Sequence, residues 1–337
     1  MIRLVVGVIT GAIGLAYLAL KPPSPKICGS PGGPPVISPR VKLRDGRHLA
    51  YREWGVGKDK ANYKIIVVHG FRGSKDHGLP IAKELVDELG LYLLSFDRAG
   101  YGESDPNSKR SVKSESFDIQ ELADKLEIGD KFYVIGTSMG GYSIWSCLYY
   151  IPHRLAGAAL VVPFVHFWWP SFPAEILNKS FNKMLPQLRL TLRVARYAPS
   201  LLYLLMSQRV FPYLSMVWGN FPFHTKKDLE IIKQKSKDES VVQDQICEQG
   251  IHESFCRDIM VGFSKWEFDP TEVSNPFPNN DGSVHLWQGY EDKMIPFEMN
   301  RYISLKLPWI KYHELPDHGH EISPSVWVDI LKELVKK

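Results

Sequence analysis

The sequence predicts an α/β protein with a mostly parallel central sheet, helices on both faces and an inserted helical cap. Between residues 41 and 163, apolar runs of strand length alternate with segments of helical periodicity. This alternation is typical of parallel strands joined by crossover helices. From 164 to 282 the sequence is aromatic-rich and helical in pattern, and strand-like sequence resumes in 283–337. We therefore expect a core of 41–163 and 283–337, with 164–282 inserted as the cap.

The core is expected to open with a β-hairpin, because a turn at Asp45-Gly46 separates two alternating segments. Continuous apolar runs then predict strands that are buried on both faces of the sheet. These apolar strands are expected at 64–70, 91–96, 132–137 and 155–162, and two further strands are expected at 283–289 and 310–315. Helices are expected at 80–89, 116–126, 143–150 and 296–305, from 324 onwards, and in the cap at 184–206.

The stretch 132–142 carries the strongest functional signal. It begins as an apolar strand, contains Gly136-Thr137-Ser138-Met139-Gly140, and leads into a helical pattern. A Gly-x-Ser-x-Gly motif is common by chance, but a strand before it and a helix after it indicate a nucleophile elbow. The helix N-terminus directly after Ser138 would face a developing negative charge. Ser138 is therefore the candidate nucleophile.

A serine hydroxyl needs a base to remove its proton, and the base needs an acid to fix its tautomer. In a sheet of this type the three residues follow the chain order serine, acid, histidine, each after a strand. Asp292 follows the strand expected at 283–289, and His320 follows the strand expected at 310–315. Loops at the carboxyl ends of parallel strands share one edge of the sheet. We therefore expect Ser138, His320 and Asp292 to meet there.

With these motifs, the chain resembles the α/β-hydrolase fold serine hydrolases, and its N-terminal apolar segment makes it similar to membrane-associated plant members. The resemblance extends from about residue 41 to the C-terminus, with the cap as the variable part. It implies an oxyanion hole formed by the backbone N–H groups of Phe71 and Met139. The matching motifs are His69-Gly70-Phe71-Arg72-Gly73, Asp97-Arg98-Ala99-Gly100-Tyr101-Gly102-Glu103-Ser104-Asp105, Gly136 to Gly140, Gly289-Tyr290-Glu291-Asp292 and Asp317-His318-Gly319-His320-Glu321.

Each triad position has a competitor nearby in the sequence. His318 competes with His320, and we favour His320 because the resemblance places the histidine after the glycine. Glu291 and Asp317 compete with Asp292. Asp317 is too close in sequence to reach the His320 ring from another loop.

Four further residues are candidates for the substrate pocket. His69 and Arg72 flank the oxyanion loop, and Trp168 with Trp169 opens the cap. Each has a structural alternative: His69 as a loop brace, Arg72 as a solvent-facing side chain, and the tryptophans as packing between cap and core. Many relatives carry proline where this chain has Arg72, so Arg72 departs from the family pattern.

The N-terminal residues 1–22 are expected to form a hydrophobic anchor, since Leu4 to Leu20 is uncharged and mostly apolar between Arg3 and Lys21. Residues 23–40 are rich in proline and glycine and are expected to be a linker. The excess of basic residues after the apolar run favours an endomembrane protein whose catalytic domain faces the cytosol. A cleaved signal peptide and a lumenal domain are the alternatives, and a glycosylation sequon at Asn178 supports the lumenal one.

Composition narrows the remaining possibilities. The net charge is +4 with no basic block, which argues against a nucleic-acid partner, and the four cysteines suggest neither a disulfide framework nor a metal site. We expect no cofactor and no metal. The expected function is that of a carboxylesterase or lipase-like serine hydrolase acting on a small lipophilic ester. A small-molecule receptor and an acyltransferase that use the same pocket are the alternatives.

Overall fold

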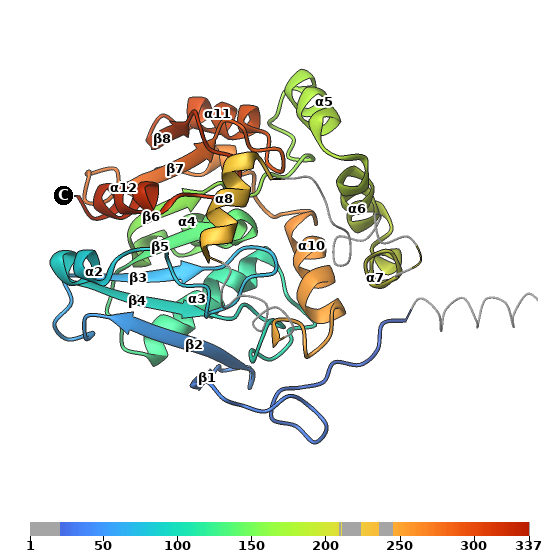
Figure 1. Cartoon of the computed structure of the whole chain (residues 1–337), viewed down its shortest axis with the longest axis horizontal. Helices are drawn as coiled ribbons and strands as arrows, with labels where there is room; N and C mark the ends of the chain where they lie inside the picture. The colour runs from blue at the N-terminus through green and yellow to red at the C-terminus, as the bar shows by residue number, and fades with distance from the viewer. Residues whose placement is uncertain (1–20, 209, 211–223, 236–244, 337) are drawn as a thin grey trace, which may run out of the picture.

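The computed structural model describes residues 21–208, 210, 224–235 and 245–336. Its centre is an eight-stranded sheet with the strand order β1-β2-β4-β3-β5-β6-β7-β8 (Figure 1). The first two strands form the predicted hairpin and run antiparallel, and the strands from β3 to β8 are parallel to one another. The strands are β1 (Arg40–Lys42), β2 (His48–Gly55), β3 (Tyr63–Val68), β4 (Leu91–Phe96), β5 (Phe132–Thr137), β6 (Leu155–Val161), β7 (Val284–Gly289) and β8 (Ile310–Leu315). The predicted fold class, a mostly parallel α/β sheet, is confirmed.

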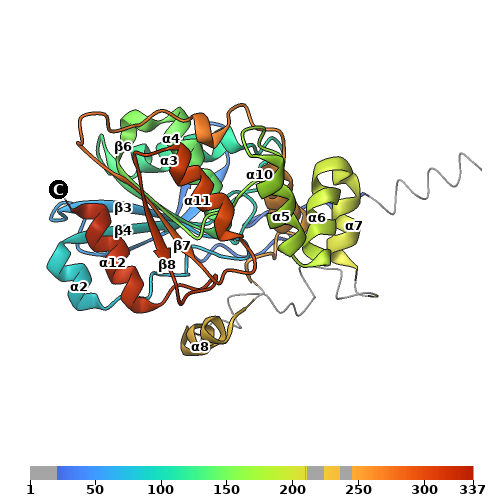
Figure 2. The ribbon, with the colours of Figure 1, turned by 90° about the horizontal axis from the view of Figure 1, so that it is seen from above.

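Helices cover both faces of the sheet (Figure 2). One face is covered by α3 (Val112–Lys125), α4 (Gly141–Tyr150) and α11 (Phe297–Lys306), whose apolar side chains form a core with β3, β5 and β6. The other face is covered by α2 (Lys83–Leu89) and α12 (Pro324–Val335). The central strands are buried on both faces, so their sequences are apolar throughout rather than alternating.

Helix α3 begins earlier than the periodicity predicted. Ser111 is its N-cap: the Ser111 hydroxyl accepts from the Ser114 backbone N–H at 3.2 Å, and the Ser114 hydroxyl accepts from the Ser111 N–H at 3.0 Å. This reciprocal capping satisfies two backbone donors that a helix start otherwise leaves unpaired. The helix therefore starts at Val112 rather than at 116.

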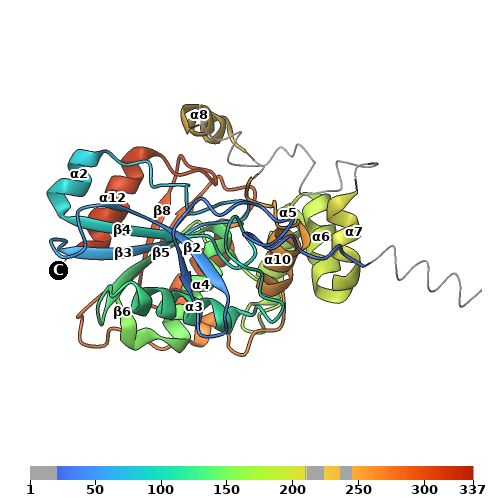
Figure 3. The same cartoon turned by 90° about the horizontal axis from the view of Figure 1, so that it is seen from below.

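The segment between β6 and β7 is largely helical and gathers at the carboxyl edge of the parallel strands (Figure 3). The single helix expected at 184–206 is two helices, α6 and α7, joined by a short 3₁₀ turn. The break falls at Ala198-Pro199, because proline has no N–H to continue the helical ladder. Among the described residues of this segment, the α-helices are α5 (Ala174–Lys183), α6 (Pro186–Tyr197), α7 (Leu202–Ser207), α8 (Lys226–Lys235) and α10 (Arg257–Gly262).

The expected anchor lies almost entirely outside the described residues, which start at Lys21. In the parts of the chain that the structure describes, no helix has the length and apolar character to cross a membrane. The expected linker, 23–40, makes specific contacts with both the inserted segment and the core. The Cys28 N–H donates to the Gln249 side chain at 3.0 Å, and the N–H groups of Ile37 and Ser38 donate to Glu103 at 2.7 and 2.9 Å. This proline-rich segment is therefore held against the fold.

Candidate active site

The turn after β5 has the strained geometry of a nucleophile elbow. Ser138 has a φ of 53°, in the left-handed region that a residue with a Cβ rarely occupies. The glycines of the motif are required by close approach. A Cβ on Gly136 would lie 2.6 Å from the Gly140 carbonyl oxygen, and one on Gly140 would lie 2.5 Å from the Val68 oxygen. The turn therefore lifts the serine clear of β5 and presses it against the end of β3.

The structure brings the three predicted residues together. The Nε2 atom of His320 lies 3.0 Å from the Ser138 hydroxyl, and its Nδ1 lies 2.8 Å from Oδ2 of Asp292. The other oxygen of Asp292 accepts from the backbone N–H groups of Met294 at 2.8 Å and Ile295 at 2.9 Å. The carboxylate is thus fixed by its own turn and oriented toward the imidazole. With Nδ1–H donating to Asp292, Nε2 is available to accept the serine proton.

The electrostatic surroundings of His320 favour its charged form. Burial by itself lowers the pKa of this imidazole, but the neighbouring Asp292 carboxylate raises it, and the net pKa lies above the usual histidine value. The side chain of Asp292 is fully buried and that of His320 is 9% exposed, so solvent screens their interaction little. A base with this environment is stabilised after it has taken a proton.

The loop after β3 lies directly beside the serine. A Cβ on Gly70 would lie 3.1 Å from both the Ser138 Cβ and the Thr137 oxygen. The next residue, Phe71, is half-buried, and its ring packs 5.2 Å from that of Phe255 in the inserted segment. The Met139 side chain is buried, and its terminal methyl lies 2.9 Å from where a Cβ on Gly262 would be. The side chains of the two expected oxyanion residues therefore take part in packing.

His69 is placed as a loop brace. Its ring is buried, its Nδ1 lies 2.8 Å from the Gly70 oxygen, and its Nε2 accepts from the Arg98 N–H at 3.0 Å. Burial lowers the pKa of His69 well below the usual histidine value, and the Arg98 charge adds to that shift. Both ring nitrogens are engaged by backbone, which favours the structural alternative over contact with substrate.

Arg72 is half-buried and has a φ of 59°, and its guanidinium lies 6.0 Å from the centre of the Phe255 ring. Trp169 is 3% exposed and stacks on His166 and Phe172 at centroid distances of 5.7 and 5.9 Å. Trp168 packs edge-on against Tyr197 at 5.8 Å. Both tryptophans thus belong to an aromatic cluster within the inserted segment, which is neither of the two expected arrangements, a substrate pocket or packing between cap and core.

Sequence reasoning missed a buried ionic network beside the site. Asp258 of α10 accepts from Arg98 at 2.5 and 2.7 Å, from Tyr101 at 2.7 Å and from Tyr142 at 2.6 Å. Arg110 donates to the same carboxylate at 3.1 Å. Arg98 and Tyr101 lie in a recognised motif, but nothing near Asp258 in the sequence marks it as their partner.

A second missed residue supports the histidine loop. Asp228 of α8 is fully buried, and its Oδ1 accepts from the Glu321 N–H at 2.8 Å. A Cβ on Gly319 would lie 2.2 Å from its other oxygen, so only glycine fits there. One carboxylate from the inserted segment therefore accepts from the residue after His320 and packs closely on the residue before it.

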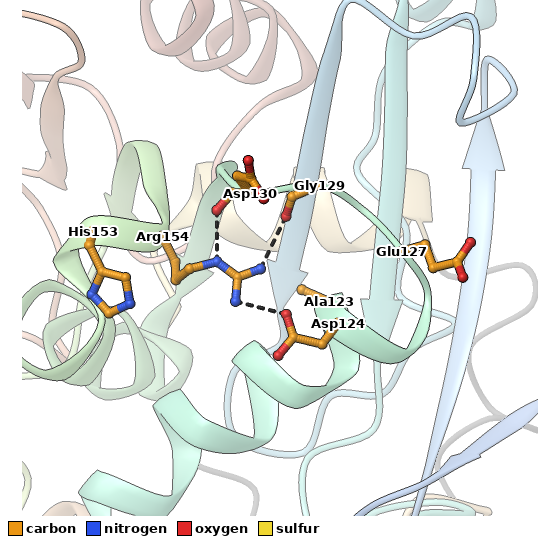
Figure 4. Close-up of a pocket in the computed structure, with 7 residues that line it drawn as sticks. All are labelled: Ala123, Asp124, Glu127, Gly129, Asp130, His153 and Arg154. Atoms are coloured by element: carbon orange, nitrogen blue, oxygen red, sulfur yellow. Dashed lines mark hydrogen bonds and ion pairs between the residues drawn. The ribbon is translucent and has the colours of Figure 1, made fainter.

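A cavity of about 220 Å³ adjoins the acid turn. Its lining includes Leu185, Tyr290, Asp292 and Phe297. A larger pocket of about 490 Å³ lies elsewhere, lined by residues that include Asp124, Asp130 and Arg154 (Figure 4). In that pocket, Arg154 donates to Asp124, Gly129 and Asp130. Asp130 precedes β5 while Ser138 follows it, a separation of roughly 20 Å along the strand, so the larger pocket has no part in the site.

Solved structures with similar folds include several hydrolases. The enol-lactonase from Burkholderia xenovorans LB400 superposes with a TM-score of 0.59 at 15% identity, over 89% of this chain and 100% of that one. The esterase RhEst1 from Rhodococcus sp. ECU1013 superposes with a TM-score of 0.57 at 15% identity, over 87% of this chain and 96% of the esterase. A thermophilic esterase from Thermogutta terrifontis superposes with a TM-score of 0.54 at 20% identity, over 88% of this chain and 97% of that esterase. At these identities the similarity establishes the α/β-hydrolase fold.

Two curated relatives match over shorter stretches. Lipase 1 of Psychrobacter immobilis is 32% identical over 103 residues, which is 30% of this chain and 31% of the lipase. The sn-1-specific diacylglycerol lipase ABHD11 of Danio rerio is 35% identical over 77 residues, 23% of this chain and 24% of that protein. The chain thus spans about a third or less of the length of these relatives.

A family model covers most of the fold. The model described as serine aminopeptidase, S33, matches residues 59–323, from just before β3 to just before α12. That range includes the elbow, the acid turn, the histidine loop and the whole inserted segment. The chain therefore belongs to the α/β-hydrolase family described as serine aminopeptidase, S33.

Proposed function

We propose that the protein is a serine-dependent carboxylesterase or lipase-like hydrolase that cleaves a lipophilic ester through an acyl-enzyme on Ser138. The observation that carries the proposal is the continuous hydrogen-bonded chain from Ser138 through His320 to Asp292. Three separate loops supply these groups, and each is braced by other contacts. The lipase and diacylglycerol lipase relatives support an ester as the substrate.

In the proposed reaction, Nε2 of His320 takes the proton of Ser138 as its hydroxyl oxygen attacks the acyl carbonyl carbon. The tetrahedral intermediate places an oxyanion between the N–H groups of Met139 and Phe71. One such donor typically lowers the barrier by about 2.7–4 kcal/mol. The closeness of Gly70 to Ser138 supports this role for the next residue, Phe71.

Asp292 stabilises the imidazolium that forms on His320. The imidazolium then gives its proton to the leaving alkoxide, and the alcohol departs to leave an ester on Ser138. Water attacks this acyl-enzyme with His320 again as the base, which releases the carboxylic acid and restores the serine.

We also propose that 164–282 acts as the cap over this reaction. It is held to the core beside the site by Asp258 and by Asp228. Its first aromatic residue contacts the elbow, since the Phe164 N–H donates to the Ser138 oxygen at 2.9 Å and the Phe164 ring lies 6.1 Å from that of Tyr142. A cap with this apolar interior favours lipophilic acyl groups over charged peptides.

The test is turnover of p-nitrophenyl esters from acetyl to palmitoyl, beside amino-acid p-nitroanilides. We expect ester hydrolysis with a preference for longer acyl chains, and a loss of about 10³-fold or more in Ser138→Ala. The exposed Ser325→Ala is the matched control. Anilide cleavage that exceeds ester cleavage would favour a peptidase. Binding without turnover by wild type would favour a receptor, and acyl transfer to an added alcohol in preference to water would favour an acyltransferase.

We further propose that residues 4–20 anchor the chain in an endomembrane with the catalytic domain in the cytosol. The uncharged run and the basic residues after it support this orientation. Asn178 of the sequon is exposed on α5, so a lumenal domain would be accessible to glycosylation there. We expect no endoglycosidase-sensitive mass on the full chain, and a glycan at Asn178 would reverse the orientation.

A further inference from the structure

The outer side of the cap carries a cluster of exposed apolar side chains. Leu190 and Tyr197 on α6 are 38% and 69% exposed, and Leu201 in the turn before α7 and Leu204 within α7 are 40% and 47% exposed. Leu190 and Tyr197 are seven residues apart and so share one side of the helix. We call these four residues the α6–α7 face. Exposed apolar residues gathered in this way mark an interaction surface rather than the scattered exposure of an ordinary surface.

The exposed apolar residues of α6 are separate from the side of the helix that packs against the protein. Helix α6 already buries a complete apolar side against the rest of the cap. Its buried residues are Leu188, Thr191, Leu192 and Ala195. Leu190 and Tyr197 are therefore additional apolar residues on the outward side. Burying them needs a partner that the described chain does not provide.

The polar positions around the face are cationic. Arg189, Arg193 and Arg196 alternate with the apolar residues of α6. Within the described part of the chain, no carboxylate lies within salt-bridge distance of these three guanidinium groups. More widely, 176–208 contains five Lys or Arg residues and no Asp or Glu, although the whole chain is nearly balanced with 41 basic and 37 acidic residues. The partner of the face must therefore be anionic as well as apolar.

The N-terminal segment approaches the same end of the molecule. The Lys26 N–H donates to the Gln249 oxygen at 3.0 Å. Shortly after Gln249, a helical turn packs on α7: the His252 ring lies 6.0 Å from that of Tyr203, and the sulfurs of Cys256 and Met206 are 3.7 Å apart. Figures 1, 2 and 3 agree that the described chain starts beside α6 and α7.

We propose that the α6–α7 face docks on the surface of an anionic phospholipid bilayer. Apolar side chains that enter the interfacial layer beside arginines that pair with lipid phosphates are the composition of a helix lying in a membrane surface. A second copy of the chain fits less well, because a two-fold contact through this face would set like-charged arginines against one another, and their partners within the described residues, Asn182, Phe181 and the Phe263 oxygen, are all uncharged. The uncharged run at 4–20 precedes a segment that starts at this end, so both would reach one membrane.

Docking through the α6–α7 face would fix how the cap and the active site are oriented relative to the membrane. The cap lies at the carboxyl edge of the sheet, where Ser138 and His320 meet, so the bilayer would adjoin the side of the molecule that holds the site (Figure 1). If the proposed ester hydrolysis is correct, the substrate would then enter from the membrane. The docking itself does not depend on that reaction.

The experiment places an environment-sensitive fluorophore on the full chain reconstituted in vesicles. Leu204→Cys carries the probe, and Leu305→Cys, an exposed leucine on α11 that is 75% exposed, is the matched control. Both variants also carry Cys247→Ser, because the other three cysteines are buried. Vesicles of phosphatidylcholine alone are compared with vesicles containing phosphatidylserine.

We expect a blue shift and quenching by brominated lipid at position 204 in the anionic vesicles only, and neither at 305. Arg189→Glu with Arg193→Glu is expected to abolish the shift, and raised salt to reduce it. Identical spectra at 204 in the two vesicle types would overturn the proposal. A probe at 204 that is already blue-shifted and not quenched by lipid would show that protein covers the face, and would overturn it equally. If the protein shows the blue shift at position 204 but no esterase activity, the proposed reaction is wrong and the docking proposal stands.

Discussion

Arg98 and Asp258 form a two-point ion pair across the junction between the sheet and the inserted segment, with N–O distances of 2.5 and 2.7 Å. Both side chains are fully buried. Burial alone raises the pKa of Asp258, but Arg98 and Arg110 lower it to about 2. Arg98 also donates to the Gly70 oxygen at 3.2 Å, in the loop that touches Ser138. One buried charge pair thus connects the inserted segment, the core and the loop after β3.

Asp258→Asn should be strongly destabilising, because it leaves Arg98 and Arg110 buried with no carboxylate. Breaking a buried pair by removing one partner costs about 3–5 kcal/mol. The control is Asp281→Asn, whose pair with Lys131 is 50% and 48% exposed, and which should change the free energy of unfolding by about 0–1 kcal/mol. Urea unfolding of both variants measures this, and equal small losses would show that the buried network contributes little.

Gly70→Ala should reduce turnover while leaving the fold intact. The new methyl group would lie 3.1 Å from the Ser138 Cβ and the Thr137 oxygen, so the loop has to move by a few tenths of an ångström. Misplacement of catalytic groups by about 1 Å can cost 10²-fold, and we expect a fall in kcat of about 10-fold or more with little change in KM. Gly57→Ala, which meets nothing within 4 Å, is the control. Unchanged kcat in Gly70→Ala would remove this loop from the reaction.

Asp292→Asn should lower kcat on the order of 10⁴-fold, as expected when the imidazole loses the acid that fixes its tautomer. Asp317→Asn and Glu291→Gln remove the two competing acids and should leave kcat within a few-fold of wild type. Steady-state ester hydrolysis of the three variants decides the assignment. A large loss in Asp317→Asn with activity retained in Asp292→Asn would contradict it.

The pH profile should have its acidic limb above pH 6.5. The reaction needs neutral His320, and the Asp292 carboxylate raises the pKa of this imidazole above its usual value. The proton is therefore retained to higher pH, and kcat/KM should fall as the pH drops through that raised pKa. His318→Gln should not move the limb, because His318 faces Ser323 at 3.0 Å and burial lowers its pKa. A limb at or below 6.5, or one that moves in His318→Gln, would contradict the role of His320.

The sequence predicted correctly those features of the fold that depend on residues close together in the chain. The strands predicted at 64–70 and 91–96 are β3 and β4, because a strand buried on both faces of the sheet is apolar along most of its length. The strand predicted at 310–315 is β8. The serine, acid and histidine turns each follow such a strand, so their order in the chain was enough to place them at one edge.

Contacts between residues that lie far apart in the sequence could not be predicted from it. Asp258 and Asp228 are isolated acids in helical sequence, and only the packing of the inserted segment brings them to Arg98 and to the His320 loop. The break between α6 and α7 was visible as Pro199, but the apolar spacing on both sides continued through it. The segment 23–40 has the composition of a linker, and its contacts depend on Gln249 and Glu103.

The most direct test of the account is covalent labelling of the purified full chain with a fluorophosphonate probe. The probe should bond to the activated hydroxyl of Ser138, and the mass of the labelled peptide identifies that residue. The Ser138→Ala variant should not be labelled. Asp292→Asn should label far more slowly, because the rate depends on the base that His320 provides. Labelling of the wild type that disappears in Ser138→Ala is the predicted result. A folded wild type that stays unlabelled, or a Ser138→Ala variant labelled as fast as wild type, would contradict Ser138 as the nucleophile.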